Sequence, residues 1–324
     1  SYRIEVPERF YDVPAGDNKT WVSIWRQRTD ELAVLAGALL ILSLLLLQQR
    51  WLTASARRFT VIRISYLIFT LGFIGWYAQG QLSIVNLTGV VQSLKESRSL
   101  AFFLYDPMTV CLWSFVAITF FLWGRATFCG WLCPFGALQE LVARLARLLR
   151  IPQIRLRRST DAKLKKIKYG VLAAILVSAW LLPEVADSLV EIEPFKTGIT
   201  LYFVRAWPFV AYAIAMVLAS ALVYKFFCRY LCPFGAGLAI LGKLQLLKWL
   251  PRRAECGTPC QTCRHRCDYQ AIRPDGKIDY DECFQCMDCV VIYHSDTQCA
   301  PRILQAKRGV IMPIRPVQAA AEVK

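Results

Sequence analysis

Two related stretches decide the fold of this chain: Phe128-Cys129-Gly130-Trp131-Leu132-Cys133-Pro134-Phe135-Gly136-Ala137 and, 99 positions later, Phe227-Cys228-Arg229-Tyr230-Leu231-Cys232-Pro233-Phe234-Gly235-Ala236. Each copy closes an apolar run. Two cysteines four positions apart lie on one face of a helix. The proline that follows disfavours helix at the second cysteine and favours a new helix start at Pro134 or Pro233. The repeat therefore predicts two equivalent helix breaks, each carrying two thiols.

Apolar residues dominate the composition and gather in long runs. The chain has 324 residues, 56% of them hydrophobic, and a mean hydropathy of +0.38. A helix needs about 20 apolar residues to cross about 30 Å of hydrocarbon. Five runs approach that length: 31–47, 59–79, 107–124, 170–190 and 207–227. They exclude a soluble enzyme. The metal-ligand spacing of the 13 cysteines also argues against a disulfide-stapled secreted domain.

The charged residues alternate between the two sides of these runs. The net charge is +16, and eleven Lys and Arg side chains lie between residues 125 and 168. By contrast, the stretch 80–106 has only Lys95 and Arg98, and 184–206 only Lys196 and Arg205. By the positive-inside rule the N-terminus is periplasmic, and the chain beyond about residue 228 is cytoplasmic. Because the basic residues lie at membrane borders, we expect the lipid membrane, and no nucleic acid, as their partner.

Eight cysteines near the C-terminus follow the spacing of a two-cluster ferredoxin. Three closely spaced thiolates bind one cluster, and the fourth ligand comes from the other cysteine run. That rule assigns one [4Fe–4S] cluster to Cys256, Cys260, Cys263 and Cys299, and a second to Cys267, Cys283, Cys286 and Cys289. The first gap is one residue longer than the usual pattern. Zinc is the alternative, but a zinc ion takes four ligands at one site and does not require this crossed arrangement of three cysteines plus one.

The repeated stretches supply four further thiols: Cys129, Cys133, Cys228 and Cys232. If the two helix breaks face each other, these thiols predict a third metal centre at the cytoplasmic end of spans three and five. An iron ion, a [2Fe–2S] unit or zinc would suit four thiolates. The alternative is four buried structural thiols. His265 and His294 are the only histidines and lie outside every run, which excludes bis-histidine haem in the membrane; we expect both in solvated loops, and Cys111 as a packing residue.

These features predict an α-helical membrane protein with about five transmembrane helices, a parallel internal repeat and a C-terminal cytoplasmic ferredoxin-like domain. We expect a periplasmic linker at 1–30, the transmembrane domain at 31–253, the ferredoxin domain at 254–310 and a tail at 311–324. Each repeat should open an amphipathic basic helix in the membrane interface. The first would carry Leu138, Leu141, Leu145, Leu148 and Leu149, and the second Leu238, Leu241, Leu244, Lys243 and Lys248.

The motifs together resemble the NosR/NirI family of membrane polyferredoxins. The resemblance rests on the duplicated CxxxCPFGA motif, the segment from Asp281 to His294, and Cys299-Ala300-Pro301. It implies the inner membrane of denitrifying bacteria and a requirement for active nitrous oxide reductase, a periplasmic copper enzyme. It also implies a preceding periplasmic flavin domain with covalent FMN, to which residues 1–30 would be the linker. No flavin residue of that domain can be assigned in this chain.

Two functions remain open at this stage. In the first, the chain passes electrons from quinol or a cytoplasmic donor through its iron–sulfur centres toward the periplasm and nitrous oxide reductase. A quinol dehydrogenase-type activity belongs to this hypothesis. In the second, it is a copper-handling or metal-reducing assembly factor for a periplasmic copper enzyme. Copper(I) carriers favour soft Met and Cys ligands, yet the four Met residues form no cluster, which favours electron transfer.

Overall fold

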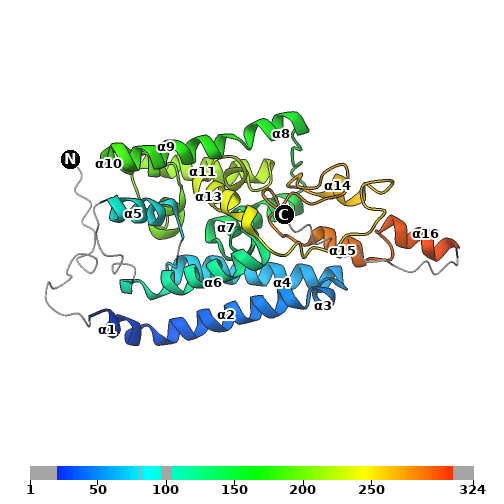
Figure 1. The fold of residues 1–324 in the computed structure, drawn as a ribbon, viewed down its shortest axis with the longest axis horizontal. Coiled ribbons are helices and arrows are strands. Elements are labelled where there is room, and N and C mark those ends of the chain that lie inside the picture. The colour runs from blue at the N-terminus through cyan, green and yellow to red at the C-terminus, as the bar shows by residue number, and fades with distance from the viewer. Residues whose placement is uncertain (1–19, 81, 96–103, 309–324) are drawn as a thin grey trace.

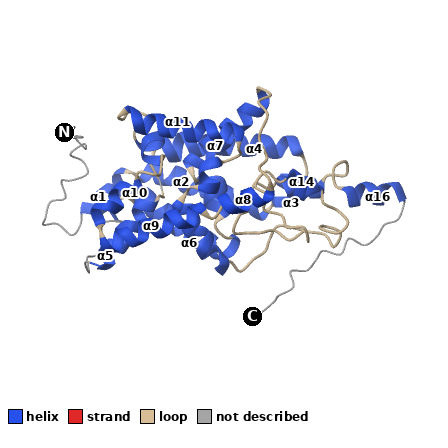
Figure 2. Ribbon diagram, turned by 90° about the horizontal axis from the view of Figure 1, so that it is seen from above, coloured by secondary structure: helices blue, strands red, loops and turns tan. Residues whose placement is uncertain are grey.

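The computed structural model describes residues 20–80, 82–95 and 104–308, which are mainly helical and, within these ranges, contain no strand (Figures 1 and 2). The bundle comprises α1 (Thr20–Gln27), α2 (Thr29–Leu47), α3 (Gln49–Thr53), α4 (Ala56–Phe69), η2 (Thr70–Tyr77), α5 (Ile84–Lys95), α6 (Pro107–Trp123), η4 (Phe128–Leu132), α7 (Pro134–Leu148), α8 (Arg158–Leu164), α9 (Ile167–Leu181), α10 (Pro183–Val190), η5 (Lys196–Thr200), α11 (Trp207–Leu222), α12 (Phe226–Tyr230), α13 (Pro233–Leu241) and η6 (Gly242–Leu244). The C-terminal part adds α14 (Thr262–Arg266), α15 (Asp288–His294) and α16 (Ala300–Arg308). It lies at one end of the bundle, opposite α5 and α10 (Figure 1).

Helices cover all five predicted runs, but only two are candidate membrane spans within the described residues. These are Thr29–Leu47 and the continuous Ala56–Tyr77, in which α4 passes into the π-helix η2. The runs at 107–124 and 207–227 form helices of 17 and 16 residues. The run at 170–190 is not one helix: α9 ends at Leu181 and α10 begins at Pro183, because proline interrupts the helical hydrogen bonds.

The second half of the predicted linker at 1–30 is helical. Residues 20–27 form α1, and α2 begins at Thr29. The Trp25 indole donates a hydrogen bond to the carbonyl of Leu104 at 2.8 Å, which fixes α1 against the chain before α6. Residues 1–19 and the predicted tail at 311–324 lie outside the described residues.

The first cysteine motif turns back into the bundle instead of leaving it. Gly124, with φ at +83°, ends α6, and the chain then runs along α4 and η2. Thr70 donates to the carbonyl of Trp131 at 2.9 Å, and a Cβ at Gly75 would lie 2.7 Å from Pro134. Gly75 is close to the end of η2 that lies away from the C-terminal part. The motif therefore extends deep among the helices.

Helix α7 is an interior helix, not the interfacial helix that the sequence predicted. It packs against α4, η2 and α11. Its buried face carries Gln139 and Glu140 beside small alanines, whereas Leu145 and Leu148 are exposed. The second helix is also shorter than predicted: α13 ends at Leu241 and excludes the two lysines.

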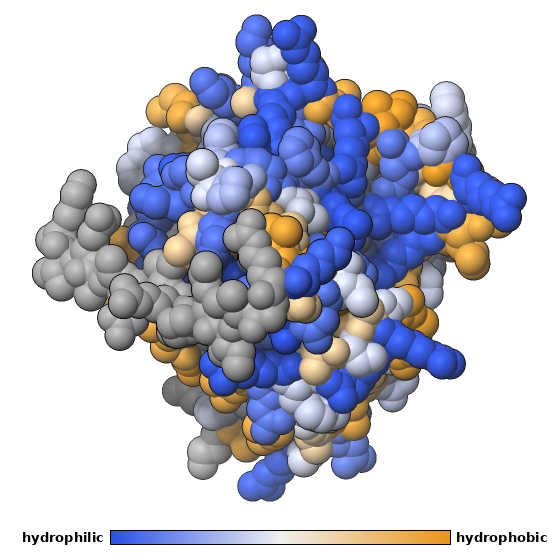
Figure 3. Space-filling model, turned by 90° about the vertical axis from the view of Figure 1, so that its right-hand side faces the viewer, coloured by the Kyte–Doolittle hydropathy of each residue, from blue (hydrophilic) through white to orange (hydrophobic). Residues whose placement is uncertain are grey.

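The C-terminal part docks onto the basic loop that follows α7. Arg155 pairs with Asp268 at 3.0 Å and Lys168 with Glu282 at 2.8 Å. Viewed from this end, the molecule is largely hydrophilic, with hydrophobic side chains around the border (Figure 3). The basic residues of the loop therefore hold the C-terminal part in addition to marking one side of the bundle.

A buried ion cluster joins α4, α7 and the second motif. Glu140 on α7 pairs with Arg63 on α4 at 2.8 Å and with Lys225 at 3.1 Å, and all three side chains are 0% exposed. Arg63 also donates to the carbonyl of Gly130, and Lys225 to that of Cys129. A buried charge without its partner is strongly destabilising.

Replacing Glu140 should therefore destabilise the whole bundle. In Glu140→Gln, two buried cations keep their carbonyl contacts but lose their counter-charge, and we expect a loss of about 3–5 kcal/mol in unfolding free energy. Thermal or denaturant unfolding of the purified protein measures this loss. Glu184→Gln, at an exposed position, is the control. Equal stability of the two variants would contradict a dominant role for the buried cluster.

Candidate functional site

The second predicted cysteine set comes together in the structure. Cys267, Cys283, Cys286 and Cys289 line one pocket, which Cys263 also borders. Cys283 and Cys286 come from one short loop, Cys289 from the first turn of α15, and Cys267 from the cysteine run before them. Four thiols at one pocket could supply the ligands of a [4Fe–4S] centre. Because Cys263 of the other predicted set borders the same pocket, the division of the ligands between two clusters stays a prediction.

The first predicted set comes together only in part. Cys256, Cys260 and Cys263 line a second, smaller pocket. Two glycines with positive φ, Gly257 and Gly276, let the backbone close around it, since a Cβ on Gly276 would lie 2.1 Å from the carbonyl oxygen of Cys256. Cys299 is buried immediately before α16 but does not line either pocket. Its role as the fourth ligand stays a prediction.

Arg252 supplies a positive charge beside these thiols. Burial raises the pKa of Cys263 to about 11, and the Arg252 guanidinium acts against that rise. Burial likewise raises the pKa of Cys283 to about 12. Two nitrogens of Arg252 are buried without a hydrogen-bond partner. Because metal ligands are thiolates, cluster binding would release protons here and give this guanidinium an anionic neighbour.

The two CxxxCP motifs adopt the predicted break. Cys133 (φ −73°, ψ 114°) and Cys232 (φ −65°, ψ 109°) are extended and cap the helices that begin at Pro134 and Pro233. Each thiol accepts a hydrogen bond from a backbone N–H three residues later, Gly136 at 3.4 Å and Gly235 at 3.2 Å. Cys129, Cys133, Cys228 and Cys232 are all buried.

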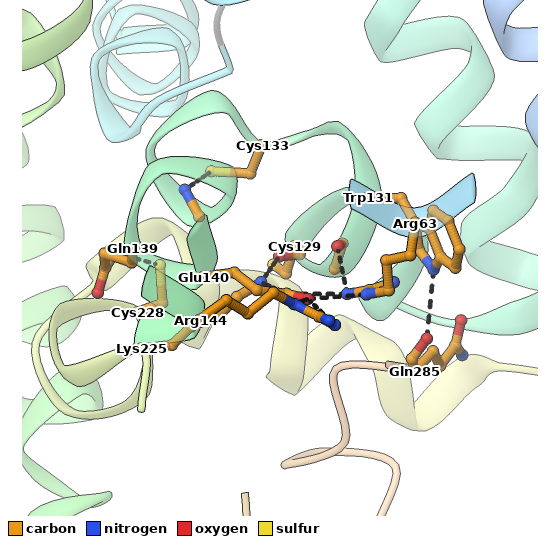
Figure 4. Close-up of polar contacts among 12 residues, drawn as sticks. Arg63, Cys129, Trp131, Cys133, Gln139, Glu140, Arg144, Lys225, Cys228 and Gln285 are labelled. Atoms are coloured by element: carbon orange, nitrogen blue, oxygen red, sulfur yellow. Dashed lines mark hydrogen bonds and ion pairs between the residues drawn. The ribbon is translucent and has the colours of Figure 1, made fainter. Parts of the chain in front are cut away.

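Gln139 connects the two motifs, a role that the sequence analysis did not predict. Its side-chain N–H donates to the Cys228 thiol at 3.0 Å (Figure 4). Its carbonyl oxygen accepts from the Phe227 N–H at 3.1 Å and from the Ser220 hydroxyl at 2.8 Å. A fully buried side chain on α7 thus positions the break in the second motif.

The cysteine side chains are not placed so that three of them could bind the same metal ion. In 20–80, 82–95 and 104–308, no three His, Cys, Asp or Glu side chains are placed to hold a single metal. In an iron–sulfur cubane each thiolate binds a different iron, so the sulfurs stand farther apart than around one zinc ion. Neither cysteine set is therefore assigned to a single ion.

The C-terminal part contacts the first motif directly through the loop between Cys283 and Cys286. A Cβ on Gly130 would lie 2.1 Å from the carbonyl oxygen of Phe284, so the two backbones touch. The Trp131 indole donates to the carbonyl of Gln285 at 3.2 Å (Figure 4). The second motif has Arg229 where the first has Gly130, and Arg229 instead binds Asp161 at 2.5 Å. This difference between the copies was visible in the sequence.

Arg125 lies between the two groups of cysteines. Its guanidinium stacks over the Phe284 ring at 4.9 Å and interacts electrostatically with both Cys129 and Cys283. Two of its nitrogens are buried without a hydrogen-bond partner. A buried cation between two thiol clusters is a second feature that the sequence analysis missed.

The remaining candidates have structural roles. His265 is exposed, as predicted, although it lies in α14 rather than in a loop. His294 is not a solvated loop residue, because it ends α15 and its Nδ1 lies 2.7 Å from the Thr53 hydroxyl. Cys111 packs against the hydrophobic core, as predicted.

Comparisons with known proteins identify sequence relatives of this chain. The NosR family model matches residues 254–310, and the model of a 4Fe-4S binding domain matches 105–152 and 205–254, the two regions that hold the CxxxCP motifs. The regulatory protein NosR of Stutzerimonas stutzeri is 45% identical over 302 residues, which cover 93% of this chain and 42% of that protein. The protein NirI of Paracoccus denitrificans is 39% identical over 91% of this chain and 44% of its own length.

This chain covers most of the length of one shorter relative. A regulatory protein NosR sequence of Pseudomonas aeruginosa is 53% identical over 81 residues, which are 25% of this chain and 81% of that sequence. The chain spans about two fifths of the length of the longer curated relatives. No solved structure matches it significantly. The chain belongs to the NosR/NirI family of iron–sulfur proteins.

Proposed function

We propose that this chain is a membrane electron-transfer module that passes electrons from a cytoplasmic ferredoxin domain into the membrane and toward the periplasm. The observation that carries this proposal is the contact between the Cys283–Cys286 loop and Gly130, with Arg125 between Cys283 and Cys129. It joins the two groups of cysteines without an intervening layer of structure. Motif thiols that only supported the fold would not require this contact with the ferredoxin domain.

Eight thiols would hold two [4Fe–4S] clusters in the ferredoxin domain. Cys267, Cys283, Cys286 and Cys289 share one pocket, and three of the other four share a second. The clusters supply one-electron storage. The protein contributes burial and the nearby guanidinium of Arg252, and both tune the reduction potential of such a site.

Cys129, Cys133, Cys228 and Cys232 would hold a third centre among the helices. The 4Fe-4S binding model matches both regions that carry them, which favours an iron–sulfur centre such as [2Fe–2S] over zinc or a single iron ion. The first motif runs along η2 as far as Gly75. Such a position reduces the distance that electrons must cover to reach a periplasmic acceptor.

The membrane arrangement follows from charge and hydropathy. We infer about five membrane helices with a parallel repeat, in the bacterial inner membrane, with the N-terminus periplasmic and the ferredoxin domain cytoplasmic. The basic loop 125–168 pairs with the ferredoxin domain, in keeping with one common side for both. Nitrous oxide reductase would be the periplasmic partner, and quinol or a cytoplasmic carrier the donor. FMN would belong to a separate flavin domain.

Replacing one ferredoxin ligand should remove one cluster and weaken its neighbour, because the ligation is crossed. For Cys283→Ser we expect iron bound by the ferredoxin domain to fall from about eight atoms per chain to about four or fewer. Iron and acid-labile sulfide analysis with EPR spectroscopy measures this, and Cys111→Ser is the control. Stoichiometric zinc without sulfide in the unsubstituted protein would contradict the assignment.

Replacing all four motif cysteines by serine should remove the third centre and leave the ferredoxin clusters in place. We expect loss of one EPR signal and of nitrous oxide reduction in cells that carry the full-length variant. Metal analysis separates iron from zinc and from copper, and copper would favour the assembly-factor hypothesis. Unchanged spectra and activity, or a variant that does not accumulate in the membrane, would mean that these thiols only support the fold.

Gly130→Ala should separate the ferredoxin domain from the first motif. The added Cβ would overlap the Phe284 carbonyl, at a cost of about 1–3 kcal/mol. We expect intact cluster content, slower reduction of the motif centre and weaker magnetic coupling between the centres. Gly72→Ala is the matched control, since a Cβ there meets nothing within 4 Å. Wild-type transfer in Gly130→Ala would show that electrons do not pass through this contact.

A further inference from the structure

We propose that a cleft between the helix bundle and the ferredoxin domain binds the phosphate group of an anionic phospholipid. The cleft has a volume of about 670 Å³ and lies between α4, α7 and α15. That volume is within the usual range for small-molecule sites. This inference does not depend on the proposed electron-transfer function.

Arginine dominates the lining of this cleft. Only Asp268 and Asp288 are acidic. The lining arginines are Arg144, Arg147, Arg150, Arg155, Arg229 and Arg266. The planar guanidinium group binds phosphate through two parallel hydrogen bonds and is the side chain best suited to it.

The neighbouring carboxylates neutralise these arginines only in part. Arg229 pairs with Asp161, but Asp268 is shared by Arg147 and Arg155. Glu140 pairs with Arg144 but also with the buried Arg63 and Lys225.

Two further arginines lie outside these ion pairs. Arg266 donates to the neutral Gln298 at 2.7 Å. Within the described residues, the exposed Arg150 side chain makes no hydrogen bond or ion pair. The cleft therefore keeps an excess of positive charge that a phosphate can neutralise.

The surface beside the cleft is apolar, which favours a lipid over a soluble anion. Leu145, Leu148 and Leu149 are 54%, 79% and 64% exposed, on the side of α7 opposite its buried face. Arg144 and Arg147 lie between the two sides. A phospholipid would place its phosphate among the arginines and its acyl chains along these exposed leucines.

Lipid binding to the purified full chain tests this inference. Native mass spectrometry would count lipids retained by the protein from nanodiscs of phosphatidylcholine alone or of an equimolar mixture with phosphatidylglycerol. The variant is Arg150→Gln with Arg266→Gln. Arg57→Gln, an exposed arginine on α4 outside the cleft, is the matched control. Inorganic phosphate added without lipid forms a separate arm, and iron content checks that each variant folds.

We expect retained phosphatidylglycerol in the unsubstituted protein and in Arg57→Gln, and an affinity lower by about fivefold for each cleft arginine removed. Equal losses in the Arg57→Gln control would overturn the inference, because they would indicate a general surface attraction. Saturation by inorganic phosphate with no preference for phosphatidylglycerol would also overturn it, because the cleft would then be a site for a soluble anion.

Discussion

The buried carboxylate of Glu140 is the interaction on which the arrangement of this protein depends. It pairs with Arg63 on α4 and with Lys225 ahead of the second motif, and these cations reach the carbonyls of Gly130 and Cys129. One side chain on α7 thereby connects both CxxxCP motifs with a long membrane helix. Such charges are tolerated in the interior only because every partner is present. This buried ion cluster consequently fixes how far α7 is buried among its neighbouring helices.

Polar contacts along the same face of α7 extend this constraint to the thiols. Gln139 binds the Cys228 thiol and the Phe227 N–H, next to the ion cluster. The interior of the bundle is thus built around hydrogen bonds and ion pairs that surround the cysteines, whereas Leu145 and Leu148 of α7 are exposed. A buried polar network holds its members in one geometry when all are satisfied. That rigidity suits a centre whose ligands must keep their positions during electron transfer.

The basic residues that follow the helices act in two ways. Positive charge next to apolar helices favours the cytoplasmic side of a membrane. In this fold the same residues also bind the ferredoxin domain, as Arg155 does with Asp268 and Lys168 with Glu282. Electrostatic docking brings the Cys283–Cys286 loop onto Gly130. The domain that would donate electrons and the motif that would accept them are held together by these charges.

Local chemistry was enough to predict the helix breaks at Cys133 and Cys232 and the family, because proline and cysteine spacing act over a few residues. Pro183 marks the division of the run at 170–190 by the same local effect. The sequence could not indicate that α7 buries its polar face or that His294 binds Thr53. These depend on contacts between segments far apart in the chain, such as Arg63 with Glu140 and Gly130 with Phe284. The leucine stripe predicted that this helix lies in the membrane interface, but ion pairing buries the face of α7 that carries Gln139 and Glu140. Tertiary structure decided this because a buried charge must meet its partner, whereas a leucine can equally well face lipid.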